Sequence, residues 1–228
     1  MHPWLLLAIE ASLEAGRAVL AVYDTDFSVD RKADDSPLTL ADRRSHQILV
    51  ERLRSASLPI LSEEGRDTPF RERRQWEMFW LLDPLDGTKE FVKRNGEFTV
   101  NVALVEAQRP IAGVVYAPVH DILYYGSLDQ GAFKLGSAQA AWQSIRDGGN
   151  DPESMAKDLL RRSERLPIAA GSPKRFTIVG SRSHGGPELE AIVREKRAEH
   201  GDVDVISAGS SLKLCLVAEG RAHLYPRT

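Results

Sequence analysis

The chain is poor in cysteine and carries no excess of positive charge. Its 228 residues include one cysteine, Cys215, so no intrachain disulfide can form, and a reducing compartment is favoured. Cys215 lies in an apolar helical pattern, which is typical of a small core residue rather than a nucleophile. The formal net charge of −3 provides no basic field for nucleic acid and no acidic tail. We therefore expect no nucleic-acid partner.

A long hydrophobic run is also missing. The apolar stretch from Trp4 to Ile9 is not preceded by a basic residue, and Glu10 and Glu14 follow it closely. This arrangement disfavours both a signal peptide and membrane insertion. Apolar positions continue at Leu13 and Val19, as in an amphipathic helix. We expect a soluble protein of the cytoplasm that does not insert into membranes.

The residues of the first half form patterns of helices and strands. Apolar content of 42% and charged content of 28% are ordinary for a globular protein, and the length suffices for one large or two small domains. Helices are predicted at about 4–22 and 41–56, with Thr39 and Asp42 placed as a capping box for the second. Four strands follow, at roughly 79–82, 98–105, 111–116 and 122–125.

The second half changes character. Residues from Ser137 to Pro173 have the composition of surface connections around one short helix. The rest alternates as βαβαβ, typical of an α/β unit. Its strands are expected at 176–180, 203–206 and 222–225, and its helices at about 187–198 and 210–218. We expect an α+β domain with antiparallel strands over residues 1–126 and an α/β domain over residues 127–228.

The most informative segment follows the apolar run from Met78 to Leu82. It reads Asp83-Pro84-Leu85-Asp86-Gly87-Thr88, and the fixed φ of proline and the free φ of glycine predict a sharp turn there. Two carboxylates crowded into such a turn repel each other unless a cation lies between them, and Mg²⁺ prefers oxygen ligands of this kind. On this segment alone an alternative stays open, in which Asp83 ends the strand and Asp86 caps a helix without a metal.

Further polar segments support the metal interpretation. Ser62-Glu63-Glu64 ends a short apolar strand, and Thr39-Leu40-Ala41-Asp42 opens a helix. Together with the segment from Asp83 to Thr88 they resemble the inositol monophosphatase superfamily of Mg²⁺-dependent, lithium-sensitive phosphatases. The stretch from Lys89 to Asn101 is similar to the 3′(2′),5′-bisphosphate nucleotidase branch in particular. The resemblance reaches the end of the chain through segments 181–184, 209–213 and 224–227.

The resemblance implies a layered α/β/α/β/α sandwich and two, or with a weaker ion at Glu63 three, Mg²⁺ ions. It assigns Glu63, Asp83 and the carbonyl of Leu85 to the first metal, and Asp83 and Asp86 to the second. An aspartate in a further Trp-Asp motif, expected shortly beyond Tyr225-Pro226-Arg227, normally completes the second site. The given sequence ends at Thr228, before that motif, so we expect the C-terminal part of the fold to be incomplete.

The resemblance also implies catalytic and substrate-binding residues. Asp42 and Thr88 orient and deprotonate the attacking water, and the helix that opens at Gly87-Thr88 offers free N–H groups to the phosphate. The expected substrate-binding residues are Glu63, Leu85, Asp86, Gly87, Thr88, Ser181, Ser183, His184 and Ser210. Capping of helices remains the alternative role for Thr88, Ser210 and Ser211. Lys213 is expected to face solvent, and His184 lacks a suitably spaced second His or Cys for a metal site.

Three functions follow from these residues. The first is hydrolysis of 3′-phosphoadenosine 5′-phosphate to AMP and phosphate, which clears a by-product of sulfate assimilation. The second is hydrolysis of inositol phosphates or a sugar bisphosphate by the same machinery, against which the segment starting at Lys89-Glu90-Phe91 argues. The third is a nucleotide-binding module without turnover, which the absent aspartate allows. In each case the partner is a small phosphorylated molecule, and the oligomeric state is left open.

Overall fold

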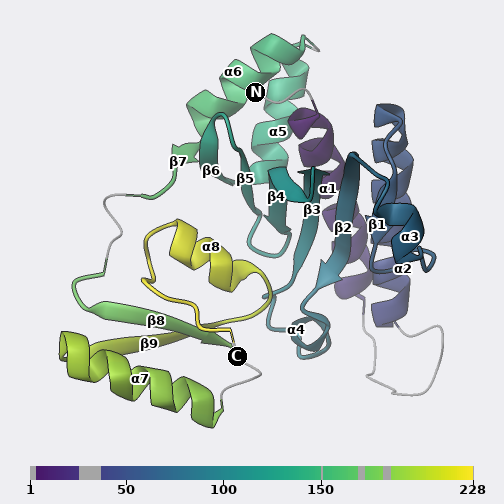
Figure 1. Cartoon of the computed structure of the whole chain (residues 1–228). Coiled ribbons are helices and arrows are strands. Elements are labelled where there is room, and N and C mark those ends of the chain that lie inside the picture. The colour runs from purple at the N-terminus through teal and green to yellow at the C-terminus, as the bar shows by residue number, and fades with distance from the viewer. Residues whose placement is uncertain (1–3, 26–36, 150, 169–172, 182–185, 228) are drawn as a thin grey trace.

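The structure, a computed structural model, describes residues 4–25, 37–149, 151–168, 173–181 and 186–227, without the side chains of residues 37 and 38. A seven-stranded sheet dominates it, with its strands in the order β1 to β7 (Figure 1). The strands are β1 (Ile60–Ser62), β2 (Met78–Asp86), β3 (Thr99–Glu106), β4 (Arg109–Ala117), β5 (Ile122–Ser127), β6 (Gly131–Gly136) and β7 (Glu164–Arg165). Only β1 pairs in parallel, with β2, and the other neighbours in this sheet are antiparallel.

Helices α1 (Leu5–Tyr23) and α2 (Pro37–Leu53) pack together and contact the large sheet on one side. A β-carbon on Gly16 of α1 would lie 2.3 Å from Cε1 of Tyr116 in β4, so only glycine permits this close approach of helix and sheet. Helices α5 (Ala138–Asp147) and α6 (Pro152–Arg162) pack against each other at the end of this layer. Their buried Trp142, Ile145 and Leu159 belong to the same hydrophobic core as the sheet.

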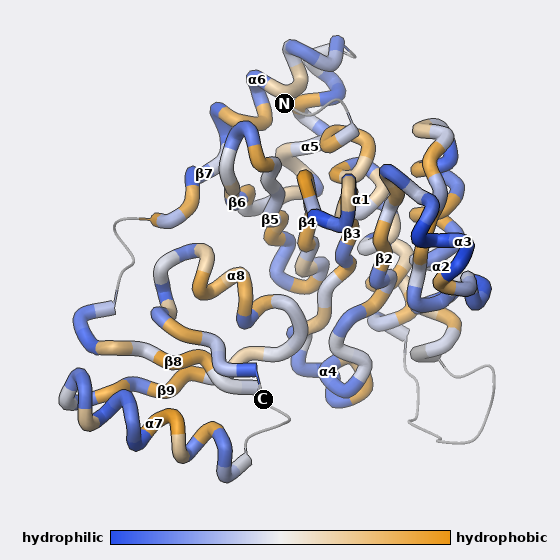
Figure 2. Tube along the Cα trace, in the orientation of Figure 1, coloured by the Kyte–Doolittle hydropathy of each residue, from blue (hydrophilic) through white to orange (hydrophobic). Residues whose placement is uncertain are grey.

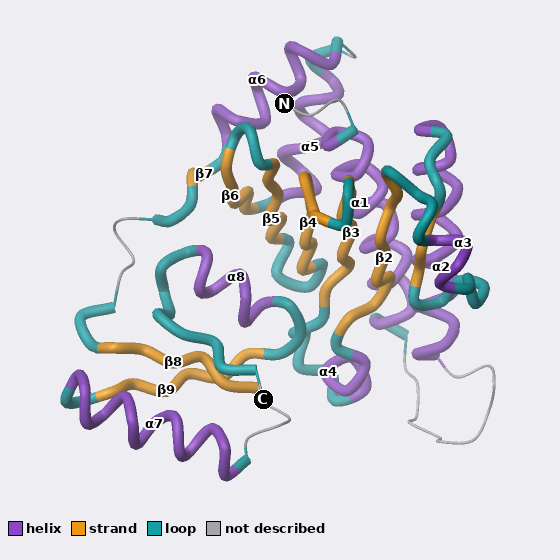
Figure 3. Tube along the Cα trace, viewed as in Figure 1, coloured by secondary structure: helices purple, strands orange, loops and turns teal. Residues whose placement is uncertain are grey.

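The other side of the large sheet faces a second unit. Helix α8 (Leu212–Ala218) lies between the large sheet and two parallel strands, β8 (Phe176–Ser181) and β9 (Val203–Ala208), and α7 (Pro187–His200) covers the far side of those strands (Figure 3). Figure 2 shows β8 and β9 as mostly hydrophobic and α7 as largely hydrophilic, as expected for an outer helix. The predicted α/β/α/β/α layering is therefore confirmed.

Several details of the first half differ from the sequence prediction. Helix α2 begins at Pro37, which suits a first helical turn, so Thr39 and Asp42 lie inside the helix and form no capping box. Strand β2 continues through Asp86 instead of ending at Leu82, and its pairing with β3 shifts between Asp83 and Asp86. The two aspartates therefore lie on an irregular strand end rather than in a turn beyond it, because a bulge accommodates Pro84, which has no N–H.

The second half also contains more regular structure than predicted. Residues 137–173 hold two helices, α5 and α6, rather than one, and β6 and β7 were not predicted. The expected strand at Ala222–Tyr225 is reduced to one bridge between Leu224 and Ile178. The division into domains at residue 126 stays a proposal; that residue lies within β5, and the large sheet continues to Arg165. Among the described helices, none combines the length and apolar character of a membrane span.

Candidate active site

Acidic side chains come together at the C-terminal end of β2, an inner strand of the large sheet. Asp83 is the register partner of Asn101 in β3, and Asp86 is the partner of Thr99. Alongside, the backbone N–H of Glu63 donates to the carbonyl of Leu82 at 3.2 Å, which extends the parallel pairing of β1 with β2 by one residue. The local pairing thus places Glu63 next to the strand end that carries Asp83 and Asp86.

Helix α2 is fixed on this strand end by two side chains that sequence reasoning missed. Ser45 Oγ donates a 2.7 Å hydrogen bond to the carbonyl of Pro84, between the two aspartates. At the next position of the helix, His46 Nδ1 and Ser62 Oγ are hydrogen-bonded at 2.9 Å. Because Asp42 lies one turn before these residues on the same helix, both contacts help to hold its carboxylate near the acidic cluster.

The electrostatics of the cluster are those of crowded, partly buried acids. Burial is the main cause that raises the pKa of Asp42 to about 7, with further contributions from the charges of Glu64 and Asp83. Burial likewise raises the pKa of Asp83 to about 7, helped by Asp86 and Glu63. Oδ1 of Asp42 and Oδ1 of Asp83 are buried with no hydrogen-bond partner in the described part of the chain. Such orphaned carboxylate oxygens fit a hard cation as ligand or neighbour.

The carboxylates are close enough to act on one another, but they do not enclose a point. Among the described residues, no three acidic, His or Cys side chains are grouped tightly enough to surround an ion as they stand. Mutual repulsion accounts for this spread. Leu85, whose carbonyl was assigned to the metal, has its side chain buried in the core at 2% exposure. Its role and those of Glu63, Asp83 and Asp86 as ligands stay predictions.

Gly87 connects this strand end to the short helix α4 (Thr88–Val92). It has a φ of +94°, and a β-carbon there would lie 3.1 Å from Cβ of Ser210 and 3.2 Å from the carbonyl of Glu97. Both the left-handed backbone and the lack of space require glycine. Gly87 is the N-cap residue of α4, so the alternative of Thr88 as the cap is not found. With five residues, α4 is shorter than expected for a strong helix dipole.

The loop before α8 reaches across and binds Asp86. Ser210 Oγ donates to Asp86 Oδ2 at 2.6 Å, and Ser211 Oγ donates to the same oxygen at 2.8 Å. Since each hydroxyl has one hydrogen, Thr99 Oγ1 donates to Ser210 Oγ at 2.6 Å, and Asn101 Nδ2 donates to Ser211 Oγ at 3.1 Å. Asp86 is therefore held by two hydroxyls that the large sheet in turn orients.

This loop and the first turn of α8 are packed closely around Asp86. The N–H of Gly209 donates to Glu97 Oε2 at 2.8 Å, and a β-carbon on Gly209 would lie 2.5 Å from Cγ of Glu90. Lys213 is 8% exposed, and its Nζ donates to the carbonyl of Ser210 at 2.6 Å. The expectation that Lys213 faces solvent is therefore wrong. Burial lowers the pKa of Lys213, while the charge of Asp86 acts in the opposite direction.

A cavity of about 830 Å³ opens between Asp86 and the second unit. Gly87, Thr88 and Ser210 line it from the loop side, and Ser181 lines it from the end of β8; the role of these four residues in substrate binding stays a prediction. Cationic and aromatic walls are added by Lys213, Tyr225 and Arg227, which lie in segments that carry the resemblance but were not among the predicted site residues. Ser183 and His184 lie outside the described residues.

Glu63 and Asp83 line a second, mainly apolar cavity of about 720 Å³ between the large sheet and α8. Asp86 and Asp83 therefore line different cavities, which share Ser211 and Leu214, and Asp42 and Leu85 line neither. No hydrogen bond joins Asp42 and Thr88 within the described part of the chain, so their pairing as catalytic residues stays a prediction. Ser211 is the N-cap of α8 without a side-chain cap hydrogen bond, so its hydroxyl serves Asp86 instead.

Comparisons with known proteins agree with this arrangement. The model of the inositol monophosphatase family matches residues 1–228. The chain is 43% identical over 218 residues to a 3′(2′),5′-bisphosphate nucleotidase CysQ of Salmonella typhimurium, covering 93% of this chain and 76% of that protein. A CysQ of Buchnera aphidicola is 36% identical over 93% of this chain and 71% of its own length.

Solved structures show the same fold. The crystal structure of CysQ from Bacteroides thetaiotaomicron, a bacterial member of the inositol monophosphatase family, superposes with a TM-score of 0.86 at 44% identity, covering 98% of this chain and 79% of that one. Mycobacterium tuberculosis SuhB, at 23% identity and a TM-score of 0.63 over 96% of this chain and 74% of its own, shares the fold. With a family match along its whole length and these relatives, the chain belongs to the inositol monophosphatase family.

Proposed function

We propose that this chain is a Mg²⁺-dependent 3′(2′),5′-bisphosphate nucleotidase that converts 3′-phosphoadenosine 5′-phosphate to AMP and phosphate. The observation that carries the proposal is the pair of buried carboxylate oxygens on Asp42 and Asp83 that have no hydrogen-bond partner among the described residues. Asp86, three residues after Asp83 on β2, lines a polar cavity large enough for a nucleotide. The nucleotidases named above support the substrate. Clearance of a by-product of sulfate assimilation in the cytoplasm and sensitivity to lithium belong to the same proposal.

The chain offers oxygen ligands for two Mg²⁺ ions, and for a weaker third ion at Glu63. Glu63, Asp83 and the carbonyl of Leu85 would hold one ion, and Asp83 and Asp86 would share in the other. Ser210 and Ser211 both donate to Oδ2 of Asp86, which leaves Oδ1 as the oxygen that can face a cation. Bound Mg²⁺ would lower the pKa of water and neutralise charge on the phosphoryl group.

The protein's own groups would position and deprotonate the attacking water. In the metal-free protein the pKa of Asp42 is raised to about 7, and bound Mg²⁺ would favour its ionised form, which is the form that can accept a proton from water as a general base. Thr88, exposed at the start of α4 on the cavity wall, would orient the water through its hydroxyl. Backbone N–H groups of α4 would donate to the scissile phosphate.

The cavity walls suit the remainder of a nucleotide bisphosphate. Arg227 and Lys213 supply positive charge for a second phosphate, and Ser181 at the end of β8 supplies a hydroxyl. Tyr225 offers a ring on which a base can stack, and Lys213 Nζ lies 5.5 Å from the centre of that ring. Ser183 and His184 are proposed as further phosphate-binding residues on the segment after β8.

The test is phosphate release from 3′-phosphoadenosine 5′-phosphate with Mg²⁺ titrated from zero, with and without lithium. Inositol 1-phosphate and a sugar bisphosphate run in parallel, and Asp83→Asn is the inactive control. We expect lithium-sensitive turnover that favours the nucleotide. Preference for one of the other substrates would contradict the nucleotidase proposal. Nucleotide binding without phosphate release at ample Mg²⁺ would indicate a binding module instead.

A further inference from the structure

Helix α8 is attached to the large sheet at both of its ends. At its start, Ser211 binds Asp86. At its end, Glu219 is the C-cap residue and is 1% exposed. Tyr124 on β5 donates its hydroxyl hydrogen to Glu219 Oε1, and Lys134 Nζ on β6 forms an ion pair with the same oxygen at 2.9 Å. The helix thus connects the proposed active site to a buried polar cluster on the sheet.

We term the cluster of Tyr124, Lys134 and Glu219 the Glu219 anchor. The pairing of β5 with β6 fixes the relative positions of its two sheet residues. Tyr124 and Lys134 are directly opposite each other on β5 and β6, so both side chains emerge on the face that meets α8. Lys134 Nζ also lies 5.8 Å from the centre of the Tyr124 ring. The backbone carbonyl of Glu219 accepts a 3.0 Å hydrogen bond from Ile168, on the connection between the two units.

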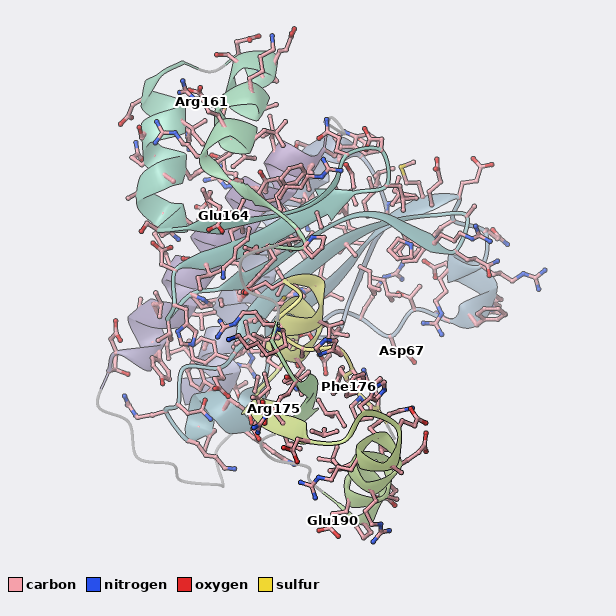
Figure 4. The ribbon with its side chains drawn as sticks, turned by 90° about the vertical axis from the view of Figure 1, so that its left-hand side faces the viewer. Asp67, Arg161, Glu164, Arg175, Phe176 and Glu190 are labelled. Atoms are coloured by element: carbon pink, nitrogen blue, oxygen red, sulfur yellow. The ribbon has the colours of Figure 1, made fainter. Side chains whose placement is uncertain are left out.

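On the side that faces the large sheet, α8 is less closely packed than on the side of Leu212, Leu216 and Val217, which pack against the core of the second unit. Leu214, Cys215 and Ala218 face the apolar cavity of about 720 Å³ rather than close-packed side chains of the sheet. In Figure 4, turned by 90° from Figure 1, α8 lies under the large sheet, with Phe176 of β8 and Glu190 of α7 on its other side. Dispersion contacts across a cavity are weak. The polar contacts at the two ends of α8 therefore fix its position relative to the large sheet.

We propose that the Glu219 anchor positions α8 and, through it, the hydroxyls of Ser210 and Ser211 that orient Asp86. Among the described residues, no hydrogen bond or ion pair joins the anchor to Glu63, Asp83 or Asp86, although Tyr124 lines the same apolar cavity as Glu63 and Asp83, so the anchor residues are assigned as positioning residues. The inference rests on the proposed function, because it assigns Asp86 to the metal and phosphate site. A buried carboxylate held by one cation and one hydroxyl is costly to leave unpaired, and this makes the anchor specific for one placement of the helix.

The test compares three single variants. Tyr124→Phe and Glu219→Gln weaken the anchor, whereas Tyr125→Phe is the matched control. Tyr125 follows Tyr124 on β5 and also loses one hydrogen bond, at 2.8 Å to Ser163 Oγ, but that bond does not involve α8. The first readout is amide hydrogen exchange of residues 209–214 in metal-free protein, and the second is the Mg²⁺ dependence of phosphate release.

We expect both anchor variants to speed exchange of residues 209–214 and to raise the half-saturating Mg²⁺ concentration about tenfold, as changes behind metal ligands do. Saturating Mg²⁺ should restore most of the kcat. Tyr125→Phe should lower the melting temperature without either effect. If the anchor variants match Tyr125→Phe in both readouts, the proposal is wrong. Tyr124→Phe keeps the ion pair between Lys134 and Glu219. If Glu219→Gln does not fold, Tyr124→Phe alone tests the proposal.

A double variant tests whether the Glu219 anchor affects the Mg²⁺ requirement through Ser211. Ser211→Ala removes one of the two hydroxyls that reach Asp86, so Glu219→Gln should raise the Mg²⁺ requirement less when added to Ser211→Ala than when made alone. Fully additive effects would show that the anchor does not act through Ser211. If the unmodified protein releases no phosphate, the proposed function fails, while hydrogen exchange of residues 209–214 still tests the anchor.

Discussion

Asp83 lies half-buried at the end of β2, with Asp86 and Glu63 nearby and Oδ1 without a partner among the described residues. A charge in this position suits cation binding but opposes folding. We expect Asp83→Asn to abolish Mg²⁺-dependent phosphate release and to raise the free energy of unfolding of the metal-free protein by about 1 kcal/mol. Urea unfolding in the presence of a chelator measures the second effect.

The control for Asp83 is Asp67→Asn, because Asp67 is an exposed acid on the surface (Figure 4). That substitution should leave both the Mg²⁺ dependence and the stability unchanged. Full Mg²⁺-dependent turnover in Asp83→Asn would remove this carboxylate from the metal site.

Gly87 is constrained both by its backbone and by its neighbours. Its φ of +94° disfavours an L-residue, and a β-carbon 3.1 Å from Cβ of Ser210 and 3.2 Å from the carbonyl of Glu97 would require these neighbours to shift by a few tenths of an ångström. We expect Gly87→Ala to cost about 1–2 kcal/mol of stability, the penalty of a left-handed backbone in an L-residue, and to lower activity by displacing Thr88. Thermal unfolding of Gly136→Ala is the comparison, because a β-carbon on Gly136 would meet nothing within 4 Å. Equal costs for the two variants would contradict the argument.

At the scale of elements, the packing of α2 on β2 depends on Ser45. Its hydroxyl is buried and donates to the carbonyl of Pro84. Replacing Ser45 with Ala leaves that carbonyl without this donor, which should cost about 1–3 kcal/mol and reduce kcat by shifting Asp42 relative to Asp83. Urea unfolding and phosphate release measure the two effects.

Ser55 provides the matched control for Ser45. Its hydroxyl also donates to a backbone carbonyl, that of Arg52 at 3.0 Å, but the bond is exposed. Ser55→Ala should therefore change neither quantity, since water replaces an exposed donor. A kcat in Ser45→Ala equal to that of Ser55→Ala would show that α2 does not position Asp42 through this contact.

For the molecule as a whole, the raised pKa values make stability depend on pH. Asp42 and Asp83 have pKa values of about 7 in the folded chain, above the ordinary value of 3.8. The folded state therefore binds more protons than the unfolded state between about pH 4 and 7. The stability from these groups is complete below pH 4 and is lost as the pH rises to 7.

This dependence is measurable as the free energy of unfolding in urea at pH 5 and pH 8 with a chelator present. We expect lower stability at pH 8, and a smaller difference in Asp83→Asn, which keeps one of the two groups. Excess Mg²⁺ should also reduce the difference, because a bound cation stabilises the ionised carboxylates. A difference that is identical in Asp83→Asn would assign the pH dependence to other residues.

The sequence by itself determined the order of the helices, strands and polar segments, and the resemblance that those segments carry implied the layered fold. Alternating and continuous apolar runs marked β2 to β5, because side-chain periodicity follows directly from strand geometry. The apolar run that ends at Leu82 placed Asp83 and Asp86 at a strand end for the same reason. The predicted element boundaries differ from the observed ones. Helix α2 begins at Pro37 rather than at residue 41. Strand β2 continues through Pro84, because its pairing with β3 tolerates a bulge there.

Only the tertiary structure decided which distant segments meet. Ser211 reaches Asp86 across 125 positions of sequence, and Glu219 reaches Tyr124 across 95. Lys213, with an ordinary place in a helix pattern, is buried because α8 is enclosed between two sheets. Periodicity shows which face of an element avoids water but not which element covers it. The contacts that orient Asp86 follow from the packing of one sheet on another, and that packing is a property of the whole chain.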